Sequence, residues 1–455
     1  MLKILNKLYY GRHYGYRVLF SRSARDTGSK PGIILADVGM PEDCKPGFYN
    51  SYMDHVFHYS IPSFLHRFIL TDRGLSLIDP SNPMAREEFT PTRLVDMYGS
   101  DQNREGRAYI DCGFKWQPPG MKKNPWDFGY FLYRGDGPGG APNICQKVAA
   151  KVAGWYYGML LPEKKIAWEY QCGLVFNEVK EKLQKEFPAA TIVHASYSDR
   201  TSLRQAVNTC LENDCDTIIY QSFCNPVYSD FEEYASVMPL LHDMVAGRAR
   251  MVFAEQPGVQ DSYQQAFVEL VADCLKDINP SSSILLVLSK HGIPFKNDTC
   301  NTRGHLYRKP LEQKMRSLFD NRKGSWDLIW SDDEYADPYW DPKNTRLSTL
   351  EAFRIAIDKG YDYALEISTE FIAENTDKMI YHALKKFTVF PDFDVNRPVP
   401  YPDWDKPLVR TFSSGKTKAI SLGCPVGKYR KFIVDAITGS ILDLRDNNNA
   451  RDKKN

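Results

Sequence analysis

The sequence predicts an α/β protein with parallel sheets that carry helices on both faces, arranged as two similar lobes. The first reason is an alternation along the chain. Short apolar runs that end in polar or Gly/Pro turns alternate with segments of helical pattern. The second reason is length, because 455 residues exceed the size at which one hydrophobic core keeps growing. We expect an N-terminal lobe at 31–230 and a C-terminal lobe at 231–390.

Strands of the N-terminal lobe are expected in three apolar segments. "PGIILADVGMPED" at 31–43 gives a strand that ends near Gly39 and Pro41. "ATIVHASYSD" at 190–199 leads into a helical pattern, and "DTIIYQSFCNPVYSD" at 216–230 leads into an acidic and apolar helix. Each unit therefore has the strand, turn and helix order of a parallel sheet.

The C-terminal lobe shows the same alternation. A strand in "ARMVFAEQPG" precedes a long helical pattern, and further strand and helix pairs follow it. We expect the remaining strands within 283–289, 326–342 and 361–371, and helices at 262–278, 349–360 and about 372–386.

One strand of this lobe is followed closely by a histidine. Five of the six residues from Ile284 to Ser289 are apolar, as in a strand covered on both faces, and Lys290 and His291 follow. Two interpretations are open. His291 is either a loop residue that caps a strand end or a functional residue, because open α/β sheets bind ligands just outside the carboxyl ends of their strands.

Composition narrows the class of partner. The 58 Lys and Arg residues balance 57 Asp and Glu residues, so we expect a small-molecule partner and no nucleic acid.

The ten cysteines form no CxxC pair, which favours reduced thiols in a cytoplasmic protein and no tightly bound cofactor. An iron–sulfur cluster built from distant cysteines is the alternative. No run reaches about 18 apolar residues, so no spanning helix is expected.

Three segments fall outside the two lobes. Residues 1–30 hold seven Lys or Arg and one acid, which suits a basic arm, a membrane-surface segment or a mitochondrial or other organellar transit peptide. We expect an arm that makes peripheral membrane contact. Residues 68–130, rich in Asp, Asn, Gly and Pro, are expected to be an insertion or lid, and residues 391–455 a C-terminal extension and tail.

The order of several motifs points to a family. They are "GIILADVGMPED", "NPVYSDFEEY", "LVLSKHGIPF" followed by "RGHLYRKPLEQKM", "LIWSDDEYADPYWDP" and "EFIAENTDKMIYH". In this order they resemble the ferrochelatase family, the class II chelatases, which insert a divalent metal into a tetrapyrrole. The resemblance covers roughly residues 31–58 and 134–390. It implies two Rossmann-like lobes of chelatase type with a cleft between them.

The resemblance also implies roles for two residues, which it assigns as catalytic and metal-binding. It places the family's cleft histidine at His291, as a metal ligand or as the base that abstracts a pyrrole proton. Imidazole suits both roles because it titrates near neutral pH and ligates Fe, Co, Ni and Zn in its neutral form. The essential glutamate of the family corresponds to Asp377, whose shorter carboxylate can still ligate a metal or accept a proton. The adjoining family histidine is Asn375 here.

The acids that surround this position also depart from the family pattern. Family members often carry acids four and eight residues beyond the glutamate, where this chain has Tyr381 and Lys385. Upstream, Glu370 and Glu374 are spaced so that a helix would put both on one face with Asp377. These carboxylates are either a relocated metal route or acids that favour the positive end of a helix dipole.

Binding of a macrocycle needs apolar and aromatic walls. In "DPYWDP" the aromatic position of the family is Tyr339, with Trp340 beside it, and both either contact the substrate or belong to the core. The other expected substrate-binding residues are Gly39, Pro41, Tyr228 and Tyr307. A cluster of acids just upstream either attracts a metal cation or forms a solvated loop, and it comprises Asp332, Asp333, Glu334 and Asp337.

These features together lead us to expect a metal chelatase. Its partners would be a porphyrin-type tetrapyrrole and a divalent metal, with Fe²⁺ as a substrate, as in haem biosynthesis. The alternative is a non-catalytic haem- or tetrapyrrole-binding protein on the same fold, which the departures at Asp377, Asn375, Tyr381 and Lys385 favour. A third hypothesis is a metal-binding protein that takes no macrocycle.

Overall fold

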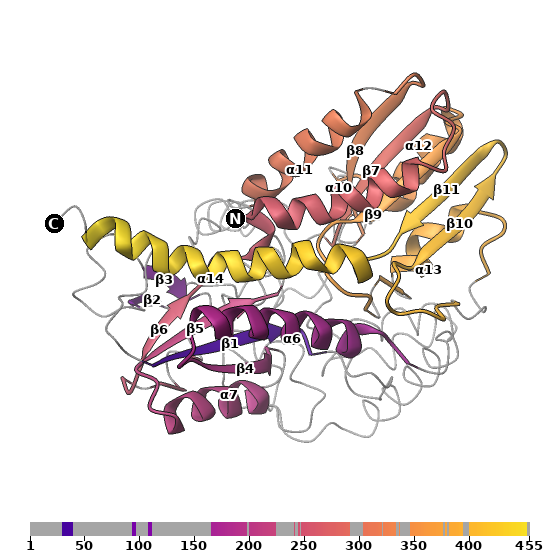
Figure 1. Ribbon diagram of the computed structural model, residues 1–455. Coiled ribbons are helices and arrows are strands. Elements are labelled where there is room, and N and C mark those ends of the chain that lie inside the picture. Colours follow the sequence, from indigo (N-terminus) through magenta and orange to yellow (C-terminus); the bar gives the residue numbers. More distant parts are fainter. Residues whose placement is uncertain are drawn as a thin grey trace, which may run out of the picture.

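The chain forms two sheets of mainly parallel strands flanked by helices, in two lobes, together with a small antiparallel sheet (Figure 1). This confirms the predicted fold class. The computed structural model describes residues 30–39, 93–96, 108–111, 165–197, 200–223, 241, 244–245, 247–291, 304–320, 322–333, 336, 346–375, 378–379, 382–394 and 400–452.

The N-terminal lobe holds a four-stranded parallel sheet in the order β4-β1-β5-β6. Its strands are β1 Pro31–Asp37, β4 Thr191–Ser196, β5 Thr217–Ser222 and β6 Arg250–Phe253. Helices α6 Trp168–Glu186 and α7 Arg200–Glu212 contact β4, and α7 also contacts β1. A Cβ atom at Gly32 would lie only 2.8 Å from the Cys210 sulfur, so glycine allows α7 to approach β1 closely.

The C-terminal lobe holds a five-stranded sheet in the order β10-β11-β9-β7-β8, in which the edge strand β10 is antiparallel. Its strands are β7 Ile284–Lys290, β8 Trp326–Asp332, β9 Tyr363–Ser368, β10 Val409–Ser414 and β11 Thr417–Leu422. Its helices are α10 Asp261–Leu275, α11 Gly304–Phe319, α12 Thr349–Asp358 and α13 His382–Lys386. A capping box between Ser348 and Glu351 fixes the start of α12.

Two boundaries differ from those expected. Strand β6 lies beyond residue 230 yet pairs with β5, so the sheet of the N-terminal lobe continues past that point. The expected C-terminal extension at 391–455 contributes β10 and β11 to the second sheet, where β11 pairs with β9. In both cases strand pairing determines membership of the lobe, and local composition does not reveal this pairing.

The two main sheets share one strand order. Within each lobe, the first four parallel strands along the chain lie in the spatial order second, first, third, fourth. In this arrangement the order reverses between the first and third strands, which are β1 and β5 in one lobe and β7 and β9 in the other. Ligands of open α/β sheets bind outside the carboxyl ends of the strands at such a switch point.

The C-terminal helix α14 Arg430–Asp452 joins the lobes. In Figure 1 it leaves the second lobe near β11 and runs between α10 and α6, both of which it contacts. Arg430 donates to the Glu178 carboxylate of α6 at 2.7 Å. The two lobes are therefore packed together through this helix.

Smaller elements complete the described structure. Strands β2 Arg93–Asp96 and β3 Ala108–Asp111 pair antiparallel within the expected insertion at 68–130. Single 3-10 turns occur at η5 Pro257–Val259, η8 Phe387–Val389 and η9 Gly427–Tyr429. Among the described helices, none combines the length and the apolar character needed to cross a membrane.

The helix expected at about 372–386 starts later in the structure. Residues 369–375 are not helical, residues 378–379 are π-helical, and α13 spans His382–Lys386. Tertiary hydrogen bonds explain the difference, because the backbone N–H of Glu374 donates to the Gln171 side chain at 2.8 Å. The Asn375 side chain accepts from the N–H of Lys378 at 2.8 Å and starts a short turn there.

Candidate active site

His291 lies directly after β7, at the switch point of the C-terminal lobe. The residue is 4% exposed, and its backbone N–H donates to the Glu370 carboxylate at 2.8 Å. Its ring makes edge contacts with Phe371 and His382, at centroid distances of 5.8 and 5.4 Å. His291 is thus a buried residue at a ligand-binding position of the fold.

Glu370 reaches His291 because β9 pairs with β7. The N–H of Thr369 donates to the Ser289 carbonyl at 2.9 Å, which extends the pairing past β9 and brings Glu370 beside His291. Burial raises the pKa of Glu370 to about 7, although the nearby His291 acts to lower it. The Oε1 atom of Glu370 has no hydrogen-bond partner among the described residues. This carboxyl group can therefore exchange a proton near neutral pH.

A buried charged cluster lies behind His291, and we define it as Asp333, Glu366, His382 and Lys386. Asp333 Oδ2 lies 3.3 Å from His382 Nδ1 and 3.4 Å from Lys386 Nζ. Lys386 Nζ lies 2.9 Å from Glu366 Oε1. All four side chains are at most 2% exposed, so these charges must be satisfied within the protein.

The charges in this cluster keep both carboxylates ionised. Burial by itself would raise the pKa of Asp333, but the charges of Lys386 and His382 outweigh it and hold that pKa below its ordinary range. At Glu366, burial also acts to raise the pKa, but the charge of Lys386 acts to lower it, and the pKa is lowered overall. Hydroxyl groups supply further donors, at 2.6 Å from Thr349 to Asp333 and at 2.5 Å from Ser421 to Glu366. The hydrogen-bonded cluster therefore forms a rigid support behind His291.

Glu374 is placed differently from Glu370. Its Oε1 atom accepts the N–H of Cys424 at 2.5 Å and lies 4.0 Å from Lys378 Nζ. A Cβ atom at Gly423 would lie 2.2 Å from the same oxygen, so the close approach requires glycine. The structure therefore brings Glu370, but not Glu374, to the backbone of His291. In the described part of the chain, no group of three or more His, Cys, Asp or Glu side chains is arranged to hold a metal ion.

Two of the expected substrate-binding residues are described. Gly39 has a φ of +77°, and a Cβ atom there would clash with Ser196, so glycine is required for this turn. Tyr307 is fully buried, and its hydroxyl donates to the Thr369 carbonyl next to Glu370. The remaining expected site residues, Pro41, Tyr228, Tyr339, Trp340 and Asp377, lie outside the described residues.

Sequence reasoning missed an imidazole and carboxylate pair in the N-terminal lobe. Asp37 is the last residue of β1, and its Oδ2 atom lies 2.7 Å from His194 Nε2 on β4. Its Oδ1 atom accepts from Trp168 Nε1 at 3.3 Å and from the N–H of Gly39. Burial lowers the pKa of His194, but its bond to Asp37 outweighs this effect and raises the pKa overall. The aspartate that ends the "GIILAD" strand was the available signal.

Hydrogen bonds connect the carboxyl edges of the two lobes. Trp168, which donates to Asp37, and Gln171 both lie in the first turn of α6. The Gln171 side chain accepts the N–H of Glu374, four residues beyond Glu370. The first turn of α6 therefore contacts the end of β1 and the segment that follows β9, so the two edges lie at one interface.

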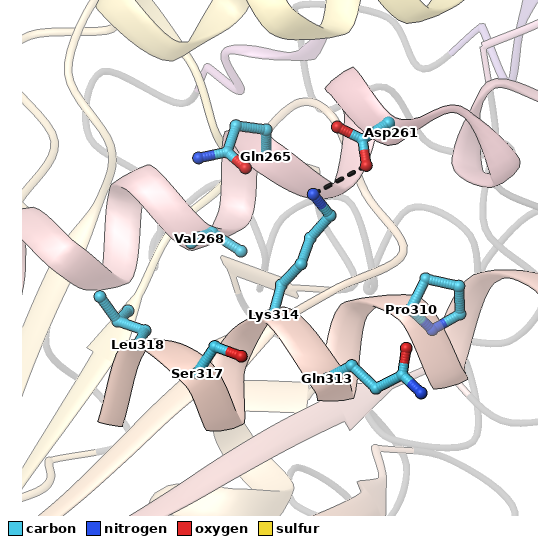
Figure 2. A pocket seen from close by; sticks show the side chains of 8 residues that line it. All are labelled: Asp261, Gln265, Val268, Pro310, Gln313, Lys314, Ser317 and Leu318. Atoms are coloured by element: carbon cyan, nitrogen blue, oxygen red, sulfur yellow. Dashed lines mark ion pairs between the residues drawn. The ribbon is translucent and has the colours of Figure 1, made fainter. Parts of the chain in front are cut away.

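A separate pocket of about 510 Å³ lies between α10 and α11. Figure 2 shows Lys314 of α11 reaching Asp261 of α10, with an Nζ to Oδ1 distance of 2.8 Å. None of the expected site residues lines this pocket.

Comparison with known proteins gives similarities of fold at very low identity. No family model and no curated protein matches the chain. Among solved structures, SirB from Bacillus subtilis with Fe³⁺ is 8% identical, with 62% of this chain and 91% of that chain covered and a TM-score of 0.38. DR2241 from Deinococcus radiodurans, described as multi-domain and structurally similar to chelatases, is 10% identical with a TM-score of 0.33. The match covers 58% of this chain and half the length of DR2241.

A different class of protein is also similar. A LacI-family transcription repressor from Corynebacterium glutamicum is 8% identical, with 59% of this chain and 83% of that chain covered and a TM-score of 0.27. At such identities a likeness concerns the backbone arrangement alone, so no residue role passes from these proteins to this chain.

Proposed function

We propose that this protein is a metal chelatase that inserts a divalent cation, with ferrous iron as the first candidate, into a porphyrin-type tetrapyrrole. The observation that supports this proposal is the buried position of His291 at the switch point of the C-terminal lobe, where its backbone N–H donates to the Glu370 carboxylate. The motif resemblance assigns the reacting histidine to the same position. Metal insertion requires groups that accept pyrrole protons and groups that ligate the cation, and imidazole and carboxylate do both.

Each residue then has a defined role. The His291 ring accepts a pyrrole proton or holds the incoming cation. Glu370 supplies the nearest carboxylate, and its Oε1 atom has no described partner that would compete for a proton or a cation. The buried charged cluster supports His291 from behind through the contact with His382. Asp377 remains our proposal for a second carboxylate.

The test is an anaerobic insertion assay. Purified protein is mixed with a porphyrin and Fe²⁺, Co²⁺ or Zn²⁺, and the visible spectrum is followed for the metalloporphyrin. We expect insertion by the wild type and a loss of about 100-fold or more in His291→Ala and Glu370→Gln, because each removes a proton-transfer or ligating group. Glu181→Gln, an exposed acid on α6, serves as the matched control and should retain the wild-type rate.

Two results would overturn this proposal. A spectral shift on binding of porphyrin or haem without metal insertion would identify a non-catalytic tetrapyrrole-binding protein. Metal binding by a protein that leaves the porphyrin spectrum unchanged would identify a metal-binding protein that takes no macrocycle.

A further inference from the structure

We propose that His194, held by Asp37, is a second proton acceptor of the same reaction and contacts the macrocycle from the N-terminal lobe. This inference rests on the proposed chelatase function. A free-base tetrapyrrole loses two N–H protons for each divalent cation that it takes up. His291 is one candidate acceptor in the proposed function, and the structure offers a second imidazole near the carboxyl edge of the other lobe.

The hydrogen bonds around Asp37 fix the orientation of the His194 ring. An ionised carboxylate only accepts hydrogen bonds, so the 2.7 Å contact places the ring proton on Nε2 and the lone pair on Nδ1. Trp168 and the N–H of Gly39 hold the other carboxylate oxygen, which leaves Asp37 little freedom to turn. A carboxylate that fixes the tautomer of an imidazole in this way prepares the ring to accept a proton.

The side chain of His194 is partly exposed to solvent. Its side chain is 40% exposed, whereas that of Asp37 is 3% exposed. None of the described residues forms a hydrogen bond with Nδ1. Phe176 and Phe223 lie at centroid distances of 5.2 and 6.4 Å from the ring. Phe223 is fully buried, but Phe176 is only partly buried, and an aromatic side chain there suits contact with a flat apolar macrocycle.

Asp37 ends the first strand of its lobe, as His291 follows the first strand of the other lobe, whereas His194 lies on β4, on the side of β1 away from β5. Strand β1 pairs with β5 at the switch point of the N-terminal lobe. The first turn of α6 joins this edge to the segment after β9 through Trp168 and Gln171. The two imidazoles thus belong to edges that lie at one interface.

The proposed step is a simple proton transfer. The pyrrole N–H bond breaks, its proton moves to Nδ1 of His194, and the electron pair stays on the pyrrole nitrogen, which bonds the incoming cation. The resulting imidazolium faces two carboxylates, Asp37 on β1 and Glu169 in the first turn of α6, and both favour its positive charge. The exposed ring then returns the proton to solvent.

The test uses His194→Ala in the full chain, with steady-state insertion of Zn²⁺ and Fe²⁺ into porphyrin. We expect the turnover rate to fall about 100-fold while the affinity for porphyrin, measured by fluorescence quenching, stays close to that of the wild type. Added imidazole should restore part of the rate, because the removed ring leaves space at an exposed site. Lys180→Ala, an exposed neighbour on α6, is the control.

Each other outcome is decisive. An unchanged rate in His194→Ala, with insertion still lost in His291→Ala, overturns this inference and leaves the chelatase proposal intact. A loss that follows porphyrin affinity and that imidazole does not restore shows a binding role and also overturns it. A wild type that inserts no metal overturns the proposed function, and this inference with it.

Discussion

The carboxyl edges of the two lobes share a strand order but differ in how their buried charge is balanced. In the C-terminal lobe, Asp333 and Glu366 share the Lys386 ammonium, and every member of the charged cluster is at most 2% exposed. In the N-terminal lobe, Asp37 is bonded instead by an indole N–H, a backbone N–H and a half-exposed imidazole.

This difference predicts that mutations at the two edges have unequal effects on the stability of the protein. A fully buried set of charges depends on every member, because removal of one leaves an unpaired charge in a medium of low dielectric. A carboxylate that keeps several donors, as Asp37 does, tolerates the loss of one better, since the other donors still satisfy its charge. We therefore expect mutations at the C-terminal edge to affect stability most and those at the N-terminal edge to affect it least.

The largest effect is expected from Lys386→Met. This change leaves Asp333 and Glu366 without their shared cation, and breaking a buried ion pair from one side costs about 3–5 kcal/mol of unfolding free energy. Urea unfolding followed by circular dichroism measures the loss.

Lys276→Met is the matched control, because its ion pair with Asp273 involves a lysine side chain that is 74% exposed. Exposed ion pairs contribute little, so this change should lower stability far less than Lys386→Met does. The double variant Lys386→Met with Glu366→Gln should recover part of the loss. A cost in Lys386→Met no larger than in the control would contradict the view that the cluster supports the C-terminal edge.

The strand pattern made most of this architecture predictable. The unbroken apolar run before Lys290 correctly indicated β7, and the alternation of strands and helices indicated two lobes of parallel sheet. The membership of β6, β10 and β11 could not be read in the same way, because it depends on strand pairing, which local composition does not mark.

The site was predictable only in part. His291 follows a strand within a motif, whereas the carboxylate beside it is Glu370, which the pattern placed on a helix together with Glu374. That segment is not helical and is bonded to Gln171 and Cys424. The spacing of residues in the sequence does not reveal these tertiary hydrogen bonds. His194 pairs with a carboxylate 157 residues away. Asp37 at its strand end offered a signal for this pair, but His194 itself belongs to an ordinary strand pattern.

A smaller effect is expected from the pH dependence of stability at Glu370. Burial raises the pKa of Glu370 from 4.5 to about 7, so between these values the folded protein binds more protons than the unfolded chain. Stability therefore falls as pH rises through this window, by about 3 kcal/mol in total, and stays level above pH 7 for this group. Glu370→Gln should remove this fall, as seen in urea midpoints at pH 5 and pH 8.

The corresponding acid at an exposed site gives the comparison for that experiment. Glu181→Gln on the surface of α6 should leave the pH profile of stability as it is in the wild type. A Glu370→Gln protein that keeps the wild-type slope would mean that the buried carboxyl group is not the source of the dependence.

The smallest effect is expected at the N-terminal edge, from Trp168→Phe. The change removes the donor that lies 3.3 Å from Asp37 but keeps most of the buried aromatic surface, so the cost should be about 1 kcal/mol in thermal or urea unfolding. Tyr170→Phe in the same helix turn loses only an exposed bond to Asp405 and should cost close to nothing. If Trp168→Phe lowered the free energy of unfolding as much as Lys386→Met, the predicted difference in stability between the two edges would be wrong. Asp37 would then depend on its donors as strictly as Asp333 depends on Lys386.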